Sequence, residues 1–324
     1  MTAKQRRRSD LRKIVGIALG VAFGALALGS GRAEAEMLTG LTSTGKLVTF
    51  DRATPGTIAT SVAITGLQAG ESVLGIDRRP ANGLLYGLGS TSHIYTINTT
   101  TGVATAVGAT PFAPALTGTA FGFDFNPVPD RIRVVSTDTT NFRLNPNDGT
   151  LAGTDTPLAY AAGDSGAGIT PRVIGSAYTN NFNGTVVTTL FGIDSNRDVL
   201  VMQGGPNGMP SPNGGVLTTI GGLGFNTSDL VGFDVSGISG VAFSSLTPPT
   251  GGASQLFTIN LATGTASLVG TIGTGLTLTG LAANTGVVPE PASLTLLCIG
   301  GLGLIAVVRG RRSRLTSTAS TDHR

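Results

Sequence analysis

The feature that most constrains the fold is a short segment, glycine followed by an apolar residue and aspartate, that recurs about every fifty residues. It ends apolar stretches at Gly75-Ile76-Asp77, Gly122-Phe123-Asp124 and Gly232-Phe233-Asp234. Degenerate copies centre on Gly175 and Gly280, so the five glycines are spaced by 47, 53, 57 and 48 residues. Self-similarity with a period of this length indicates a repeat architecture.

A second recurring segment is an alternating strand that runs into a glycine turn. Residues 94–98 (Ile-Tyr-Thr-Ile-Asn) lead to Thr101-Gly102, and residues 256–260 (Leu-Phe-Thr-Ile-Asn) lead to Thr263-Gly264. Weaker copies stand in two further units. An alternating strand followed by a short loop that ends in glycine predicts a β-hairpin.

One more apolar segment lies between the two signatures, so each unit is expected to hold four short strands in about fifty residues. That number of strands in that length matches one blade of a β-propeller. The complete units span residues 72–108, 119–160, 172–221 and 230–272.

The two ends of the repeat region complete one another. Residues 37–66 supply three strands without a first strand, and residues 276–284 supply a first strand with nothing after it. We therefore predict an all-β, propeller-like domain of five four-stranded blades, in which strands from both ends close the ring and remove exposed sheet edges. The alternatives are a β-sandwich and an irregular β-solenoid.

Composition agrees with an exported β-protein. No apolar stretch recurs at helical spacing between residues 38 and 288, where Glu and Lys are nearly absent. Residues 36–288 hold nine basic and fourteen acidic residues, so the basic surface that binds nucleic acid is missing. The one cysteine, Cys298, lies outside this segment, so no disulfide is expected to stabilise the domain.

The N-terminus has the three parts of a secretory signal peptide. A basic segment (residues 4–13) precedes an apolar run (residues 14–28), and the small residues Ala33 and Ala35 form a cleavage site before Glu36. Residues 1–35 are therefore predicted to be removed on export.

Two alternatives remain open at this end. A transmembrane anchor is less favoured, because fifteen apolar residues are short for a membrane span. Arg7-Arg8 is typical of a twin-arginine signal, but Asp10 stands where that pattern needs a hydrophobic residue, so the general secretory route is favoured.

The C-terminus carries a tripartite signal of another kind. Pro289-Glu290-Pro291 is followed by an apolar run, residues 293–308, and then by a cluster of arginines. The cluster contains Arg309, Arg311, Arg312 and Arg314. The run is expected to enter the inner membrane, with the arginines on the cytoplasmic side.

These residues closely resemble the PEP-CTERM sorting signal of Gram-negative bacteria. The resemblance implies recognition by an exosortase, cleavage near Pro289-Glu290-Pro291, transient anchoring in the inner membrane, and delivery to the cell surface or extracellular matrix. Residues 315–324 extend beyond the point where such signals usually stop, which leaves the role of this short polar tail open. An ordinary short anchor is the alternative.

Residues 37–284 resemble a bacterial family with a domain of unknown function, number 4394, through the Gly-Ile-Asp and Tyr-Thr-Ile-Asn repeats. This resemblance implies no activity and no site residues. The predicted organisation is a signal peptide (1–35), a propeller-like domain (36–286), a sorting signal (287–314) and the tail.

Aspartates are the main candidate site residues. Asp77, Asp124 and Asp234 hold equivalent places in three units and would share one level of the ring if their strands line its axis. Two interpretations fit this pattern. The aspartates form an oxygen-rich site for Ca²⁺ or a substrate, or each of them caps the turn after its own strand. Turn capping is favoured, because Pro80 and Pro127 follow closely and indicate turns.

A second set of oxygen side chains is Asp194, Asn196 and Asp198, which alternate as in a calcium loop. The glycine that such a loop needs at its sixth position is Val199 here, and no Glu follows six residues later. A plain hairpin turn is the favoured interpretation.

The chain lacks the residue types that other kinds of binding or catalytic site need. The chain has two histidines and no tryptophan, so sites for zinc, copper or haem and aromatic sugar platforms are not expected. His93 precedes a predicted strand, where a solvated turn residue is favoured over a catalytic base.

The function predicted from the sequence is that of an exported surface or matrix protein with a non-catalytic binding or structural domain. No cofactor is expected, with calcium as the alternative. The expected partners are the exosortase and an extracellular polysaccharide or surface protein. The alternative is a propeller hydrolase or lyase that uses the inner-strand aspartates, with or without calcium.

Overall fold

The computed structural model describes residues 36–285. The predicted signal peptide with Ala33 and Ala35 lies outside the described residues. So does the predicted sorting signal, with Pro289, Glu290, Pro291, the apolar segment 293–308 and the arginines that follow it. Within the described part, no helix has the length and apolar character needed to cross a bilayer.

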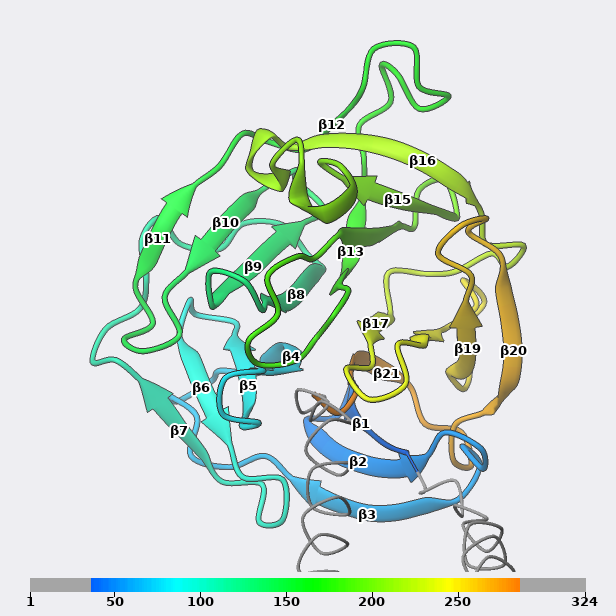
Figure 1. The fold of residues 1–324 in the computed structure, drawn as a ribbon. Coiled ribbons are helices and arrows are strands. Elements are labelled where there is room, and N and C mark those ends of the chain that lie inside the picture. The colour runs from blue at the N-terminus through cyan, green and yellow to red at the C-terminus, as the bar shows by residue number, and fades with distance from the viewer. Residues whose placement is uncertain (1–35, 286–324) are drawn as a thin grey trace, which may run out of the picture. The chain divides into compact units, whose positions relative to one another are not determined.

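Residues 37–285 form a five-bladed β-propeller, in which five sheets surround a central axis (Figure 1). The blades contain, in ring order, β21-β1-β2-β3 (blade I), β4–β7 (blade II), β8–β11 (blade III), β13–β16 with β12 (blade IV) and β17–β20 (blade V). The predicted all-β fold and its five blades are therefore confirmed.

Each blade runs from an inner strand at the axis to an outer strand at the rim. The inner strands are β4 (Val73–Arg78), β8 (Phe121–Asn126), β13 (Val173–Tyr178), β17 (Val231–Val235) and β21 (Leu278–Ala282). The second and third strands are β1 (Met37–Thr42), β2 (Lys46–Asp51), β5 (Leu85–Gly89), β6 (Ile94–Ile97), β9 (Arg131–Ser136), β10 (Asn141–Leu144), β14 (Leu190–Asp194), β15 (Val199–Gln203), β18 (Ala242–Leu246) and β19 (Gln255–Ile259). The outer strands are β3 (Ile58–Ala63), β7 (Ala104–Val107), β11 (Leu151–Thr154), β16 (Val216–Gly222) and β20 (Ala266–Thr271).

Blade IV carries the additions to this plan. The two-residue strand β12 (Ala159–Tyr160) pairs in parallel with β16, with Ala159 opposite Val216. Residues 159–160 were expected in the preceding unit, so this boundary of the predicted blade is wrong. Two short 3-10 helices, η1 (Pro206–Gly208) and η2 (Pro212–Gly214), follow β15 in the same blade (Figure 1).

Burial decreases from the axis to the rim. Every residue of β17 and β18 is buried, whereas every residue of β20 is at least partly exposed. Apolar side chains of the described residues form five clusters, each shared by two neighbouring blades. The core is therefore a ring of five wedges between the sheets, and each blade is stabilised by both neighbours.

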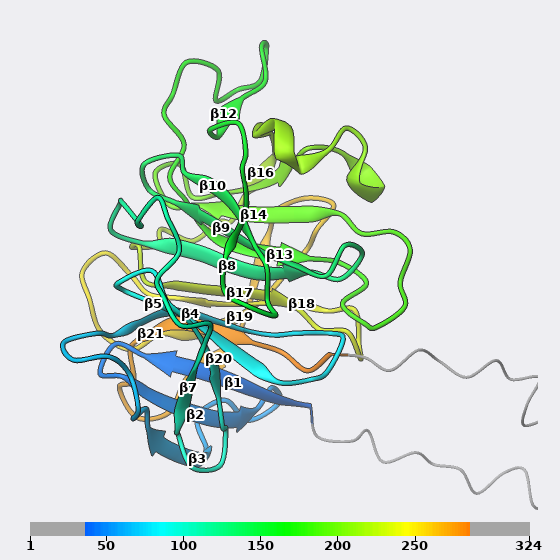
Figure 2. The same cartoon turned by 90° about the vertical axis from the view of Figure 1, so that its left-hand side faces the viewer.

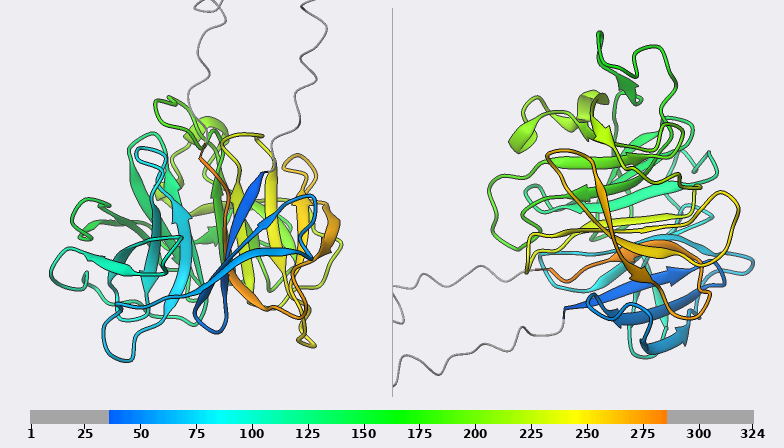
Figure 3. Two further views of the ribbon diagram at one scale, coloured as in Figure 1. Left: turned by 90° about the horizontal axis from the view of Figure 1, so that it is seen from below. Right: turned by 90° about the vertical axis from the view of Figure 1, so that its right-hand side faces the viewer.

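Strands from the two ends of the domain close the ring, as predicted. β21 pairs antiparallel with β1, with Thr39 opposite Ala282 and Gly40 opposite Leu281. Since these strands are antiparallel, β1 begins where β21 ends. We call the face on which the inner strands begin the start face, and the face on which they end the end face. Both ends of the described chain lie at the end face (Figures 2 and 3).

The repeated glycines are required where inner strands of adjacent blades approach closely. A Cβ atom at Gly232 of β17 would lie 2.6 Å from both the Gly280 carbonyl carbon and the Leu281 Cβ, and closer still to the Leu281 nitrogen. At the other blade junctions, too, the repeated glycine lies against the residue that follows the equivalent glycine of the next blade. These pairs are Gly75 with Phe123, Gly122 with Ser176, Gly175 with Phe233, and Gly280 with Ile76. The repeat therefore encodes contacts between blades.

Candidate functional site

Three aspartates of the repeat meet at the axis. Asp77 of β4, Asp124 of β8 and Asp234 of β17 are buried, with 0–1% of each residue exposed. One carboxylate oxygen from each lies within 4.8 Å of the oxygens from the other two. The equivalent spacing in the sequence thus places three carboxylates together inside the ring.

Each of these aspartates binds the backbone of the next blade. The Phe125 N–H donates to Asp77 Oδ2 (2.8 Å), and the Tyr178 N–H donates to Asp124 Oδ1 (3.2 Å). The Ala283 N–H donates to Asp234 Oδ2 (2.6 Å). In each case the donor is the residue that directly follows the position equivalent to the aspartate in the next blade. The carboxylates therefore join blades II to III, III to IV and V to I.

The turn-capping interpretation of these aspartates is wrong. The turns that follow their strands are held by other side chains: Asn82 Oδ1 accepts from Leu84 N–H, and Asn126 Oδ1 accepts from Val128 N–H. Ser236 Oγ holds the third turn by accepting from Ile238 N–H. The sequence pattern was correct in making the three aspartates equivalent, but each has a backbone partner on the adjacent blade. Asp77 Oδ1 also accepts from the N–H of the next residue, Arg78 (2.6 Å), within its own strand.

The two blade junctions that lack an aspartate of the repeat are joined by other polar contacts. Between blades IV and V, Arg172 Nε donates to Asp229 Oδ1 (2.9 Å), and Ser195 Oγ donates to the same oxygen (2.7 Å). The Arg172 guanidinium lowers the pKa of Asp229. Between blades I and II, an Arg78 guanidinium nitrogen donates to Thr39 Oγ1 (3.2 Å).

Burial sets the electrostatics of the carboxylate cluster. It raises the pKa of Asp77 well above its usual value, and the charge of Asp234 raises this pKa further. Burial likewise raises the pKa of Asp124, with the charges of Asp77 and Asp234 as further causes. Burial raises the pKa of Asp234 to about 6, although the Ala283 N–H partly offsets the effect. Three carboxyl groups buried this close together require either a compensating positive charge or protons bound to some of them.

The structure does not bring Asp194, Asn196 and Asp198 together as one set of ligands. They belong to the hairpin between β14 and β15, in which Asp194 is opposite Val199, so the hairpin interpretation is confirmed. Asp194 Oδ2 accepts from the Tyr160 hydroxyl. Asp198 Oδ1 accepts from the Thr227 N–H (2.9 Å). These carboxylates stabilise loops through different partners.

His93 lies in the turn between β5 and β6, as expected, but the expectation of a solvated side chain is wrong. The side chain is 14% exposed. Its Nδ1 lies 3.0 Å from Thr91 Oγ1 and 3.5 Å from Glu71 Oε1. The Thr91 hydroxyl itself donates to Glu71 (2.7 Å), so this group holds the turn closed.

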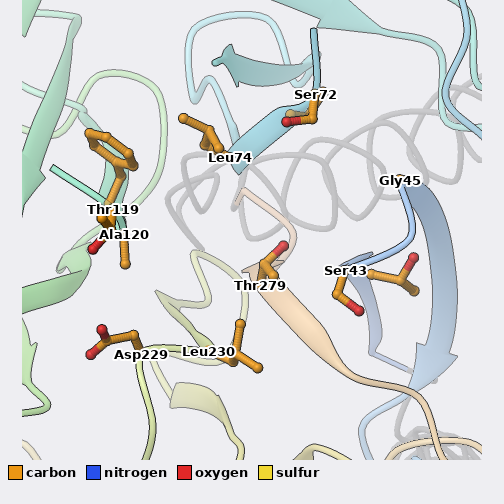
Figure 4. A pocket seen from close by; sticks show the side chains of 12 residues that line it. Ser43, Gly45, Ser72, Leu74, Thr119, Ala120, Asp229, Leu230 and Thr279 are labelled. Atoms are coloured by element: carbon orange, nitrogen blue, oxygen red, sulfur yellow. The ribbon is translucent and has the colours of Figure 1, made fainter. Parts of the chain in front are cut away.

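A cavity of about 230 Å³ opens at the start face around the axis. Figure 4 shows side chains from blades I, II, III and V around it. Its lining includes the hydroxyl groups of Thr42, Ser43, Ser72, Thr119 and Thr279, and Asp229 adds a carboxylate. The apolar residues of the lining include Leu74, Ala120 and Leu230. Sequence reasoning missed this site because the apolar stretches before the repeated glycines supply only part of its lining. Nothing in the order of residues shows that these stretches meet Ser43 and Asp229 in the folded ring.

A second cavity, of about 310 Å³, lies between blades III and IV on the end face. Val186, which is 82% exposed, and Arg143 belong to its lining. The Arg143 guanidinium is paired with Asp155 (Nε to Oδ2, 2.8 Å), which also pairs with the buried Arg133. These charges are therefore used to hold the blade together.

The family model described as a domain of unknown function, DUF4394, matches residues 46–282, which is most of the chain. This chain belongs to the DUF4394 family. A second model, the PEP-CTERM protein-sorting motif, matches residues 287–312 of this DUF4394 protein. Both resemblances seen in the sequence are confirmed. The DUF4394 protein is thus exported and processed by an exosortase, with its C-terminal segment as the sorting signal.

The chain matches no curated protein. Among solved structures, glutaminyl cyclase from Myxococcus xanthus aligns with a TM-score of 0.40 and 11% identity, over 75% of this chain and 84% of the cyclase. PorZ, a surface component of the type-IX secretion system of Porphyromonas gingivalis, aligns with a TM-score of 0.37 and 13% identity. That match covers 71% of this chain and 27% of PorZ. At these TM-scores the likenesses assign no activity to the DUF4394 domain.

Proposed function

We propose that this protein is displayed at the cell surface or in the extracellular matrix of a Gram-negative bacterium. There its propeller serves as a non-catalytic domain that binds extracellular polysaccharide at the start-face cavity. The observation that carries the proposal is the position of this cavity. It opens on the face opposite to the one where the described chain ends at Thr285, two residues before the matched sorting motif.

The chemistry of the cavity suits a sugar. Hydroxyls of Ser43, Ser72 and Thr119 and the Asp229 carboxylate can exchange hydrogen bonds with sugar hydroxyls. Leu74 and Leu230 offer apolar surface to the ring carbons. A volume of about 230 Å³ is below that of most small-molecule sites, so we expect the cavity to take one unit of a polymer.

Burial of the aspartates supports the non-catalytic assignment over the hydrolase or lyase. A general acid or base must come within hydrogen-bond distance of its substrate. Asp77, Asp124 and Asp234 are at most 1% exposed, and each gives one oxygen to a backbone N–H of the next blade. A polymer at the start face would have to displace the packing of the axis to reach them.

The experiment is binding of the host's purified matrix polysaccharide, measured by biolayer interferometry. Ser43→Arg and Thr119→Arg place long side chains at the exposed rim and should each weaken binding at least tenfold. Val186→Arg, at an exposed position of the end face, is the matched control and should bind like the parent. Absence of binding by the parent, or equal loss in the control, would contradict the proposal, and release of oligosaccharides would favour the enzyme.

A further inference from the structure

The carboxylate cluster at the axis is rich in negative charge and poor in positive charge. Arg78 is the cation that acts on Asp77 and Asp234. Its guanidinium donates to the Gly83 carbonyl oxygen and to Thr39 Oγ1, both at 3.2 Å. Its hydrogen bonds thus go to neutral oxygens. One guanidinium beside three buried carboxylates leaves negative charge that burial makes costly.

Two oxygen atoms at this site lack a hydrogen-bond partner among residues 36–285. One is Asp124 Oδ2, and the other is Oδ1 of Asn181, a residue that is 0% exposed. Leaving a buried acceptor without a partner costs about 1–3 kcal/mol. Both atoms are therefore available to a bound group.

Asn181 is aimed at the cluster from the loop after β13. Its Nδ2 lies 3.5 Å from Asp234 Oδ1, at the outer limit of a hydrogen bond. Turning the amide over would give up this long contact and direct the unpartnered Oδ1 toward the cluster, and the two orientations of an amide are not distinguished by its shape. Blade IV, which has Ala177 in place of the aspartate, thereby supplies an oxygen ligand through its loop.

The oxygen atoms at this site favour a hard cation. Carboxylate and amide oxygens are the ligands of Ca²⁺, Mg²⁺ and Mn²⁺. Opposite ligands of Ca²⁺ are separated by about 4.6–5.2 Å, twice the usual bond length, and those of Mg²⁺ by about 4.0–4.2 Å. Separations of up to 4.8 Å allow the three carboxylate oxygens to share one ion. Mg²⁺ loses its water ligands reluctantly and usually keeps several of them, so a buried site favours Ca²⁺. A small cavity of about 10 Å³ is lined by the residues just before the aspartates and has room for about one water molecule.

From this geometry we propose that Asp77, Asp124, Asp234 and Asn181 bind one Ca²⁺ ion on the axis of the ring. The ion connects blades II, III and V through carboxylates and blade IV through the amide. It compensates the buried charge and fixes the inner strands against one another. Calcium is therefore a structural ligand of the propeller, independent of the start-face cavity.

The test uses the full chain, purified in mild detergent and freed of metal with EGTA. Equilibrium dialysis against radioactive Ca²⁺ should give one ion per chain. Circular dichroism melts should show Tm about 5–10 °C higher with free Ca²⁺ at a hundred times its Kd than in EGTA. Mg²⁺ at equal concentration should give a smaller shift.

The variants locate the site without disturbing the blade contacts. Asp124→Asn keeps an oxygen for the Tyr178 N–H but removes the charge, and Asn181→Ala removes the amide ligand. Each should weaken Ca²⁺ binding at least tenfold and reduce the shift in Tm. Asp194→Asn, a buried aspartate bound to Tyr160, is the matched control and should respond like the parent.

Two outcomes would overturn the proposal. The first is a parent chain that binds no Ca²⁺ and melts at the same temperature in EGTA, especially if Asp124→Asn is more stable, as expected for carboxyls that share protons. The second is a calcium response that persists at full strength in Asp124→Asn and Asn181→Ala, which would place the ion elsewhere.

Discussion

The contact between the inner strands β17 and β21 can be tested with one methyl group. Gly232→Ala adds a Cβ atom that would lie 2.6 Å from the Gly280 carbonyl carbon and from Leu281 Cβ. Ordinary contact begins near 3.4 Å, so the strands must separate by nearly 1 Å. The obstacle includes backbone, which no change of rotamer can move.

The energetic cost has two parts. Overpacking of a tight interior typically costs about 1–3 kcal/mol. The hydrogen bond from Ala283 N–H to Asp234 Oδ2 is 2.6 Å long. Separating the strands by nearly 1 Å would lengthen it beyond the usual hydrogen-bond range. A hydrogen bond to a charged group contributes about 1.5–3 kcal/mol. We therefore expect Gly232→Ala to lower the free energy of unfolding by about 3–5 kcal/mol.

The matched control is Gly222→Ala in the outer strand β16. A Cβ atom there meets nothing within 4 Å, and the position is exposed. Loss of glycine's freedom in the unfolded chain should make this variant neutral or more stable by up to about 1 kcal/mol. Gly280→Ala should be intermediate, since its nearest neighbour is a side-chain atom, Ile76 Cγ1, at 3.3 Å.

The assay is equilibrium urea unfolding followed by far-ultraviolet circular dichroism, with thermal melts in parallel. For a chain of this size, 3–5 kcal/mol corresponds to a Tm lower by roughly 6–20 °C. Equal urea midpoints for Gly232→Ala and Gly222→Ala would refute the argument that the repeated glycines are required by contacts between blades.

Three further predictions concern closure, pH and processing. Deleting residues 276–284 removes β21, so the purified variant should lose its cooperative melt, and an unchanged Tm would show that closure is dispensable. Burial raises the pKa of Asp138, but hydrogen bonds from three hydroxyls outweigh it and lower the pKa to about 2. A lowered pKa adds stability that is present above about pH 4 and lost as the pH falls through 2. Because Asp138 is exposed, solvent screens part of this effect, and the deficit of Asp138→Asn in urea unfolding should be at most about 1 kcal/mol at pH 7 and shrink between pH 4 and 2. A constant deficit would contradict the assignment. Intact mass of the protein released by its host should show a chain that begins near Glu36 and lacks the C-terminal arginines. Recovery of the full-length chain, from Met1 to Arg324, would argue against both cleavages.

The sequence by itself determined the number of blades and the way the ring closes. The repeated glycines, alternating strands and hairpin turns are local patterns, and their period counts the units directly. The unmatched strands at 37–66 and 276–284 indicated closure, because a propeller with an open edge leaves backbone groups unpaired. The equivalence of Asp77, Asp124 and Asp234 was readable for the same reason.

Only the tertiary structure decided what these residues contact. Asp124 accepts from Tyr178, 54 positions away, and no spacing within a unit distinguishes that bond from a cap on its own turn. Asn181 belongs to no repeat, yet the loop after β13 turns its amide toward Asp234. Residues 159–160 read as the end of one blade but pair with the next. Partners across a blade junction are selected by distance in the folded ring, and the sequence orders residues only along the chain.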